Sequence, residues 1–489
     1  MDTKALRQKI LDLAIRGKLV PQDPNDEPAS VLLERIRAEK QQMVKDGKLK
    51  PKDIKNDTVI FKGDDNLHYE QFQDGTINEY ENEPPFEIPS KWVWCNLGML
   101  FSHNTGKALN ASKTDGASLT YITTSNVYWN SFELGNLKIM PFTDSEIEKC
   151  TVKKGDLLVC EGGDIGRAAI WQFENEIRIQ NHRHRLRPYD RIYTKFYYYI
   201  MYLYKSNGRI NGNGIGLQGL SSNALHNIIV PVPPVEEQKR IVDSIDSVLS
   251  LIEQIESHKQ KLSSQIDNIK SKILDLSIRG KLVPQDPNDE PASVLLERIR
   301  AEKEELIKQG KIKRDKKESD IFKGDDNSYY EKYGEKLPSG WVVTNFETLL
   351  SYEQPTNYIV KDTNYNSEYE TPVLTAGKSF ILGYTNEKEN IFSELPVIIF
   401  DDFTTESKFV DFPFKVKSSA MKILHINTDL VLPKFAFYLM QATQIDHDNH
   451  QRYWISTYSQ EEIALPPLKE QERILSVLEQ YFKLLNCLL

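Results

Sequence analysis

The stretch RGKLVPQDPNDEPASVLLERIRAEK occupies residues 16–40 and recurs, letter for letter, at residues 279–303. When both copies are extended back, to residues 9 and 272, they differ at one of 32 positions. A match of this length does not arise by chance, so the chain carries an internal duplication. The fold must therefore use the same segment twice, at two places separated by unrelated sequence.

The duplication extends over most of the chain but leaves two regions unmatched. Three further pairs follow in the same order: IFKGDDNLHYE (60–70) with IFKGDDNSYYE (321–331), IPSKWVW (88–94) with LPSGWVV (337–343), and PPVEEQKRI (233–241) with PPLKEQERI (466–474). Between the last two pairs, each half holds an insert without obvious similarity to the other. Solenoids show many short repeats, whereas two long ones predict a pseudo-twofold molecule.

The segment after Pro233 and Pro234 predicts one long helix, which ends before Gly280. Its apolar residues recur at alternating steps of four and three, which is typical of a coiled-coil helix. From residue 236 to 276 the helix would be roughly 60 Å long, at about 1.5 Å per residue. The seam positions are Ile241, Ile245, Val248, Ile252, Ile255, Lys259, Leu262, Ile266, Ile269, Ile273 and Leu276.

The two ends of the chain repeat this pattern. The matching positions are Ile474, Leu478, Tyr481, Leu485 and Leu488 near the C-terminus, and Leu6, Ile10 and Leu13 near the N-terminus. Laid end to end, the terminal segments reproduce the central helix with a gap of about seven residues. We therefore expect the termini to meet and to form a broken second helix, antiparallel to the central one. An ordinary buried bundle helix is the alternative, but it does not explain why the ends complement each other.

The first insert reads as short strands and turns, with a helix expected at residues 193–204. In NHRHRLR a strand would place Arg183, Arg185 and Arg187 on one face. Such a row suits phosphates or guanine edges, whereas an exposed strand face near Glu174 and Glu176 is the alternative. The nucleic-acid-binding candidates of this insert are Lys107, Thr124, Asn126, Arg167, Arg183, Arg185 and Gln218.

The second insert differs in charge. Residues 337–465 contain 9 Lys/Arg and 17 Asp/Glu, whereas residues 88–234 contain 16 and 11. We expect the cations of the acidic insert to gather on one face, since a nucleic-acid-binding role depends on local rather than net charge. Its candidates are Lys378, Ser379, Thr404, Thr405, Lys408, Lys417 and Arg452. Asp401 and Asp402 are weak candidates for a metal site.

The remaining composition favours a binding scaffold over an enzyme. The four cysteines are scattered without zinc-site spacing, and neither a P-loop nor a methyltransferase motif is present. No apolar run has the length of a membrane-spanning helix, and the first residues lack the apolar core of a secretory signal. We therefore expect a cytoplasmic protein without catalytic residues, bound metal or cofactor.

The whole pattern resembles the specificity subunits of Type I restriction–modification systems. The segments that carry the resemblance are VPPVEEQKRIV (232–242), LPPLKEQERIL (465–475), KILDLSIRGKLVPQ (272–285) and its first copy, VKKGDLLVCEGGDIGRAAI (152–170), PVLTAGKSFILGYTN (372–386) and FDDFTTESKFVDFPFKVKSSAMKIL (400–424). The resemblance covers nearly the whole chain, and its specificity lies in the two-copy arrangement.

This resemblance implies an α+β fold in which two mixed α/β target-recognition domains are separated by a long antiparallel coiled-coil helix pair, with pseudo-twofold, circular organisation. The expected parts are an N-terminal half-helix (1–20), a repeat segment (21–87), the first recognition domain (88–234), the central helix (235–280), the second repeat segment (281–336), the second recognition domain (337–465) and the C-terminal helix (466–489).

The resemblance also implies a function and partners. A non-catalytic subunit would read a bipartite site in double-stranded DNA and dock two methylation subunits, which bind S-adenosylmethionine and methylate adenine. Restriction (motor-nuclease) subunits would complete the complex, and no membrane is involved. A protein-assembly scaffold whose inserts bind protein is the alternative, and salt-sensitive DNA binding distinguishes the two. An all-in-one methyltransferase is a third hypothesis, which the missing cofactor motif disfavours.

Overall fold

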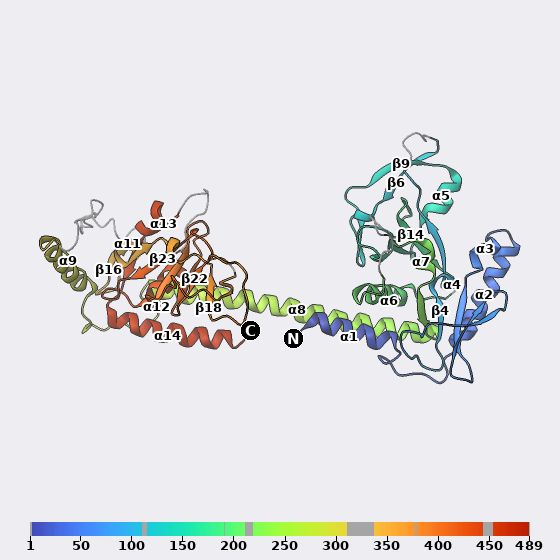
Figure 1. The fold of residues 1–489 in the computed structure, drawn as a ribbon, viewed down its shortest axis with the longest axis horizontal. Helices are drawn as coiled ribbons and strands as arrows, with labels where there is room; N and C mark the ends of the chain where they lie inside the picture. Colours follow the sequence, from blue (N-terminus) through green and yellow to red (C-terminus); the bar gives the residue numbers. More distant parts are fainter. Residues whose placement is uncertain are drawn as a thin grey trace. The chain divides into compact units, whose positions relative to one another are not determined.

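The computed structural model describes residues 2–109, 115–189, 191–210, 219–310, 337–375, 377, 379–443 and 453–488. The chain divides into two compact units, unit 1 at Met1–Ser257 and unit 2 at His258–Leu489 (Figure 1). The boundary falls within the long helix α8 (Val235–Ile278), so each unit contains part of it. The helix matches the one predicted from the heptad pattern.

We call the duplicated parts of the sequence (1–87, 235–336 and 466–489) the frame. Unit 1 begins with the frame and continues with the first insert. Its helices and short 3-10 segment are α1 (Thr3–Ile15), α2 (Ala29–Lys45), α3 (Pro51–Ile54), α4 (Leu97–Leu100), η1 (Thr124–Asn126), α5 (Asp144–Cys150), α6 (Thr194–Ser206) and α7 (Ser222–His226). Its strands are β1 (Thr58–Lys62), β2 (His68–Phe72), β3 (Ile77–Glu79), β4 (Val93–Asn96), β5 (Phe101–Thr105), β6 (Ala117–Ile122), β7 (Val127–Tyr128), β8 (Ser131–Phe132), β9 (Lys138–Phe142), β10 (Thr151–Val152), β11 (Leu157–Cys160), β12 (Ala168–Ile170), β13 (Ile177–Ile179), β14 (Arg183–Pro188) and β15 (Ile229–Val232).

Unit 2 follows a related order. Its helical segments are α9 (Ala292–Lys308), α11 (Phe346–Leu349), η2 (Pro355–Tyr358), α12 (Pro433–Ala442), α13 (Tyr453–Ser456), η3 (Tyr458–Gln460) and α14 (Leu468–Asn486). Its strands are β16 (Val342–Asn345), β17 (Leu350–Glu353), β18 (Thr371–Leu374), β19 (Ile381–Thr385), β20 (Val397–Asp401), β21 (Ser407–Val410), β22 (Lys415–Val416), β23 (Met421–Ile426) and β24 (Glu462–Leu465).

The two inserts share a sheet topology that their sequences do not reveal. In unit 1 an antiparallel sheet has the order β12-β11-β14-β5, and in unit 2 the corresponding sheet has the order β21-β20-β23-β17. A second sheet in each unit contains one parallel pair, β6 with β13 in unit 1 and β18 with β22 in unit 2. The inserts therefore have the same fold although their sequences have diverged.

Each unit has an apolar core beneath these sheets. In unit 1, α6 packs against α1 and β12 (Figure 1). It also contributes a row of buried aromatic side chains to the core. In unit 2, α12 packs against β21 and α14. A second cluster in each unit fills the space between the two sheets of the insert. Each insert is thereby held on a frame helix by its own helix, α6 or α12.

The frame helices run antiparallel within each unit. In unit 1, Arg7 of α1 bonds to Glu256 of α8, whereas Gln22, just after α1, bonds to Glu237 near the start of α8. In unit 2, Lys270 of α8 bonds to Asn486 at the end of α14. The bond between Gln285, beyond α8, and Glu470 at the start of α14 fixes the opposite direction of these two helices.

The predicted seam is buried only in part. Ile241, Ile245, Ile252, Ile266 and Leu478 are buried, and Val248 and Leu485 are half-buried. The prediction was wrong for six seam residues, which are exposed to 47% (Ile255), 38% (Leu262), 44% (Ile269), 38% (Leu276), 48% (Tyr481) and 60% (Leu488). Helix length is the reason in the middle of α8, where Leu262 lies, because α1 starts at residue 3 and α14 ends at residue 486.

The duplicated frame builds the same polar junction in both units. Trp92 Nε1 donates to Glu237 Oε2 at 2.9 Å, and Trp341 Nε1 donates to Glu470 Oε2 at 3.0 Å. Burial raises the pKa of both carboxyls. Gly17 has φ +65°, and a Cβ there would lie 2.4 Å from the ring of Pro89, so the turn after α1 requires glycine.

Further bonds of the junction are also duplicated. Their paired members are Arg240–Asp26 with Arg473–Asp289, the bond of Gln238 Nε2 to Pro233 O with that of Gln471 Nε2 to Pro466 O, and the bond of Tyr193 N to Gln238 Oε1 with that of Leu432 N to Gln471 Oε1. The last pair ties the start of α6 or α12 to the frame. The repeated sequence thus holds both inserts by the same contacts.

Candidate nucleic-acid interface

Three loops of unit 2 meet at one edge of its two sheets. They are residues 375, 377, 379 and 380 after β18, residues 402–406 after β20 and residues 417–420 after β22. Lys417 N donates to Leu374 O at 3.1 Å, and Asp402 N donates to Ala420 O at 3.4 Å. Tyr453 N, at the start of α13, donates to Asp402 O at 2.9 Å. Backbone hydrogen bonds therefore join the three loops, which we call the edge loops of unit 2.

Unit 1 contains an equivalent set, which we call the edge loops of unit 1: residues 123–126, 161–167 and 180–182. Gln180 N donates to Ile122 O at 3.4 Å, and Glu161 N donates to His182 O at 3.1 Å. Leu220 N, just before α7, donates to Glu161 O at 2.8 Å. The same three bonds thus join corresponding loops in both units, although the loop sequences differ.

The edge loops of unit 2 collect most of the described residues predicted for this insert. Lys417, Ser379 and Thr404 are exposed, and Thr405 is half-buried. Lys408 lies one residue into β21, half-buried, with Glu406 at 3.5 Å. The expectation that the cations of this insert gather on one face stays a prediction, because Lys378 and Arg452 lie outside the described residues and only Lys417 and Lys408 can be placed here. Hydroxyl, amide and ammonium donors at one edge suit phosphate oxygens and base edges.

Sequence reasoning missed Phe403, which stands out from this edge with 49% of its surface exposed. Asp401 Oδ1 accepts from the backbone N–H of Phe403 at 2.9 Å and of Thr404 at 3.0 Å, and Thr405 adopts φ +58°. This tight turn fixes the ring in an exposed position. The only sequence signal was Asp-Asp before Phe-Thr-Thr, because aspartate favours such turns. Asp402 is buried and pairs with Lys422 at 3.5 Å, so it is not a free metal ligand.

The edge loops of unit 1 carry a mixture of charges. Arg167 lies over the ring of exposed Tyr128 at 5.2 Å, and its Nη2 donates to Thr124 O at 2.7 Å. His182 is exposed beside Glu161, with Nδ1 and Oε2 3.3 Å apart. Arg167 and Thr124 are thus brought together as neighbours, and each is half-buried.

The prediction of an exposed arginine row on β14 was wrong. Arg183 is 1% exposed and Arg185 is 3% exposed. The Nη1 of Arg183 donates to Gln180 O and Asn181 O, while that of Arg185 donates to Lys149 O and Thr151 O. Burial lowers the pKa of Arg183 to about 10. The alternation along β14 is as expected, but the second sheet covers this face, so these arginines bind backbone carbonyls of the protein itself.

The prediction that Lys107 and Asn126 bind nucleic acid was also wrong. The Lys107 side chain is 7% exposed and pairs with Glu146 at 2.6 Å, which lowers the pKa of that carboxyl to about 2. Asn126 is buried, and its side chain accepts from Thr123 N and donates to Glu133 O. Both side chains are occupied by local structure. Gln218, Lys378 and Arg452 lie outside the described residues.

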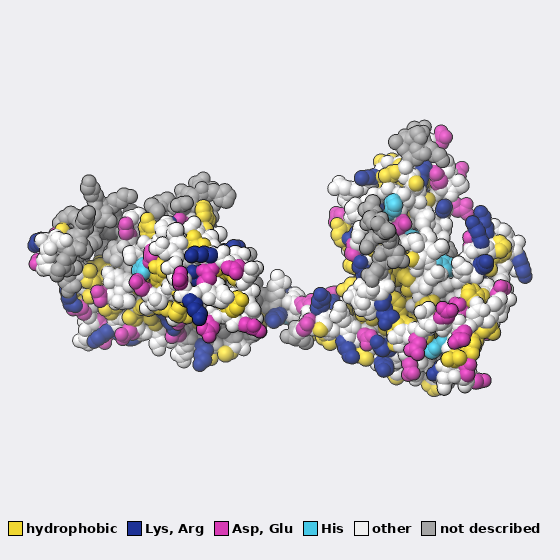
Figure 2. Space-filling model, in the orientation of Figure 1, with side chains coloured by type: hydrophobic (Ala, Val, Ile, Leu, Met, Phe, Trp, Pro, Cys, Tyr) yellow, Lys and Arg dark blue, Asp and Glu magenta, His cyan; other side chains and the backbone are white. Residues whose placement is uncertain are grey.

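On the face drawn in Figure 2, both units mix charges rather than showing a basic patch. Figure 2 shows Lys and Arg interspersed with Asp and Glu over the side that faces the viewer. Within the described ranges, no three His, Cys, Asp or Glu side chains are grouped to hold a metal ion. In the same part of the chain, no helix is long and apolar enough to cross a membrane.

A family model described as the Type I restriction modification DNA specificity domain matches residues 89–264 and again residues 338–488. The two matches together cover more than half of the chain. The chain belongs to this family. The duplicated matches coincide with the two inserts and the frame helix that follows each, which agrees with two equivalent sets of edge loops.

Individual relatives are named specificity subunits of Type I restriction enzymes. The Type I restriction enzyme EcoAI specificity subunit of Escherichia coli is 29% identical over 454 residues, which are 82% of this chain and 70% of that protein. The EcoEI specificity subunit of Escherichia coli is 31% identical over 398 residues, 69% of this chain and 60% of that protein. A solved chain from work on complex assembly and conformational transition of the type I R-M system aligns with TM-score 0.51 at 15% identity, over 83% of this chain and 93% of that one. This last likeness concerns the fold alone.

Proposed function

We propose that the chain is a non-catalytic subunit that reads a bipartite site in double-stranded DNA, one half-site with each unit. The observation that carries the proposal is the occurrence of equivalent edge loops in both units, joined by the same backbone bonds. A constant scaffold with divergent loops suits two related recognition tasks with different targets, because loops on rigid elements carry binding function.

The second insert is acidic as a whole, so its binding to DNA would depend on the charges at the edge loops of unit 2. Lys417 is exposed at the edge of unit 2, whereas Asp402 of the same edge is neutralised by Lys422. Phe403 adds an exposed ring to this surface, and aromatic and apolar groups contact thymine methyls or stack on bases. Few phosphate contacts combined with base-edge contacts would make binding by unit 2 weakly salt-dependent.

The duplicated frame would serve two further roles. We infer that α1, α8 and α14 form the antiparallel coiled-coil pair of a pseudo-twofold, circular molecule and hold the recognition domains at a fixed separation. Two equivalent frame surfaces would dock two methylation subunits, in which S-adenosylmethionine would bind, and restriction subunits would join that complex. No cofactor is proposed for this chain, and the assembly would act in the cytoplasm.

Mapping of methylated adenine in DNA tests this function. Cells would express the chain together with the methylation subunit of its own system, and single-molecule sequencing would read the modified positions. We expect a motif of two parts separated by unread bases, absent when the chain is omitted. A variant with Phe403→Ala and Thr404→Ala should alter one part and leave the other unchanged. An unchanged motif would contradict the assignment of the edge loops.

The alternative is an assembly protein whose inserts bind protein, which the acidic charge of the second insert favours. Titration of the purified chain with duplex DNA at two salt concentrations separates the two functions. DNA binding that weakens with salt supports the specificity subunit, since phosphate contacts release counterions. Failure to bind DNA, alone or with its methylation subunit, would favour the assembly protein.

A further inference from the structure

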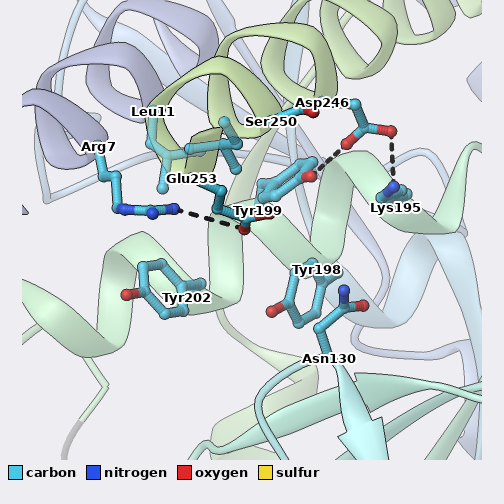
Figure 3. Close-up of a pocket in the computed structure, with 11 residues that line it drawn as sticks. Arg7, Leu11, Asn130, Lys195, Tyr198, Tyr199, Tyr202, Asp246, Ser250 and Glu253 are labelled. Carbon is cyan, nitrogen blue, oxygen red and sulfur yellow. Dashed lines mark hydrogen bonds and ion pairs between the residues drawn. The ribbon is translucent and has the colours of Figure 1, made fainter. Parts of the chain in front are cut away.

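A cavity of about 420 Å³ lies in unit 1 where the insert helix meets the two frame helices. Figure 3 shows Arg7 of α1 on one side and Tyr198 and Tyr202 of α6 on the other, with Asp246 and Glu253 contributed by α8. Lys195 and Tyr199 both bond to Asp246 and close one end. The cavity has the size of a small ligand site, about 300–1,000 Å³.

The aromatic residues beside this cavity form a row that ends at the opening. Trp129 packs against Tyr198 with ring centroids 6.2 Å apart, and Tyr198 packs against Tyr199 at 5.3 Å. Trp129 also contacts Tyr202 at 5.0 Å. Beyond Tyr199 the next position on α8 is Leu249, which lines the cavity and carries no ring. The row therefore stops at open space.

The corresponding row in unit 2 continues onto the frame helix α14. Phe409, Phe437, Tyr438 and Phe482 follow one another at centroid distances of 6.1, 5.6 and 5.5 Å. By alignment of α6 with α12 and of α8 with α14, Tyr198 corresponds to Phe437 and Leu249 to Phe482. Arg7 corresponds to Lys270, which lies 6.0 Å from the Phe482 ring. Unit 2 thus carries an aromatic ring, Phe482, at the position where Leu249 lines the cavity of unit 1.

Resting on the proposed function, we propose that this cavity of unit 1 receives an aromatic side chain from a docked methylation subunit. The chemistry of the lining is that of an aromatic site, because Tyr199 offers a ring edge and Arg7 a cation for the ring face. The floor consists of frame helices, which are the proposed docking surface. The two docking positions of the molecule are therefore not equivalent, since unit 2 carries the ring of Phe482 at the position of Leu249.

Leu249→Phe tests this proposal by supplying the ring from the chain itself, as unit 2 does. The readout is the binding of purified methylation subunit to full-length chain, measured by titration calorimetry and by native mass spectrometry of stoichiometry. We expect one of the two binding events to weaken about tenfold, the loss typical of an important interface side chain. The matched control is Phe482→Leu in unit 2, which should not weaken either event.

Tyr202→Gln is the second variant, because Gln441 occupies the equivalent position in unit 2. It removes a ring that lines the cavity and adds no bulk to the cavity. It therefore tests the proposal even if the Leu249→Phe chain fails to fold. The same single binding event should weaken. Two unchanged binding events in a folded Leu249→Phe chain would overturn the proposal. If the unmodified chain bound no methylation subunit at all, the proposed function itself would fail, which is a distinguishable result.

Discussion

The indole Nε1–H of Trp92 donates a 2.9 Å hydrogen bond to the buried carboxylate of Glu237, 145 residues further along the chain. Gln22 donates to the other oxygen of this carboxylate at 2.5 Å. One acceptor thereby joins the turn after α1, the strand entry before β4 and the start of α8. Trp341, Glu470 and Gln285 repeat the arrangement in unit 2.

Glu237→Ala should destabilise unit 1 by about 1–3 kcal/mol, because it leaves the buried indole N–H of Trp92 without an acceptor. Glu470→Ala should have the same effect on unit 2. The control is Glu236→Ala, whose side chain is exposed one residue earlier, and which should cost below about 1 kcal/mol. Calorimetric melting of the full chain measures all three, and equal melting temperatures for the two unit 1 variants would refute the structural role of Glu237.

Arg185→Ala and Lys417→Ala should weaken DNA binding in different ways. Arg185 bonds to two backbone carbonyls inside unit 1, so its loss should cost about 1–3 kcal/mol of folding stability. Lys417 is exposed, so its loss should leave the melting temperature unchanged and reduce the slope of log affinity against log salt by about 0.9. Lys388→Ala, exposed beyond the opposite end of β19, is the control.

A lower melting temperature for Lys417→Ala would contradict its assignment as a surface contact. For Arg185→Ala, weakened DNA binding with an unchanged melting temperature would instead mean that this residue contacts DNA directly. That result would contradict its burial inside unit 1.

The pair His103 and His184 predicts sensitivity to acid. His184 Nε2 donates to Leu220 O at 2.8 Å, so its Nδ1 must accept from His103 Nε2 at 2.9 Å, and both rings are neutral. Burial lowers the pKa of His103 to about 3 and also lowers that of His184. Between pH 3 and about 6.5 the unfolded chain binds more protons than the folded one, so stability falls as pH falls below about 6.5.

His103→Gln removes one of these titrating groups and keeps a donor for His184. The loss of stability between pH 7 and pH 5 should shrink, by at most about 1.4 kcal/mol per pH unit. The melting temperature of unit 1 at the two pH values measures the effect, with exposed His258→Gln as control. An identical pH dependence in His103→Gln and the unmodified chain would contradict the neutral pair.

Ile252→Asp should lower the melting temperature of unit 1 sharply, because it buries a charge at a site that is 2% exposed. Leu251→Asp is the matched control, since Leu251 is 56% exposed on the same turn of α8. We expect the control to melt within a degree or two of the unmodified chain. Similar melting of both variants would mean that α8 is not packed along the seam.

Much of the frame could be predicted from sequence. The heptads predicted α8, because helix periodicity is a local property, and the first insert was expected to contain a helix where α6 lies. Ser379, Thr404, Thr405 and Lys417 of the edge loops of unit 2 were also named from the sequence, whereas Phe403 was not. The common topology of the inserts was not predictable, since strand pairing depends on contacts between residues far apart in the chain.

The sequence by itself determined the duplication, the long helix and the place of two divergent inserts. Repetition and periodicity can be recognised along the chain without any knowledge of tertiary contacts. Only the tertiary structure decided which face of each strand meets water. Arg183 and Arg185 alternate as an exposed row would, yet a second sheet covers them. Their guanidinium groups donate hydrogen bonds to backbone carbonyls, among them those of Gln180 and Thr151. Burial is a property of neighbours, and neighbours in space are chosen by packing rather than by local sequence.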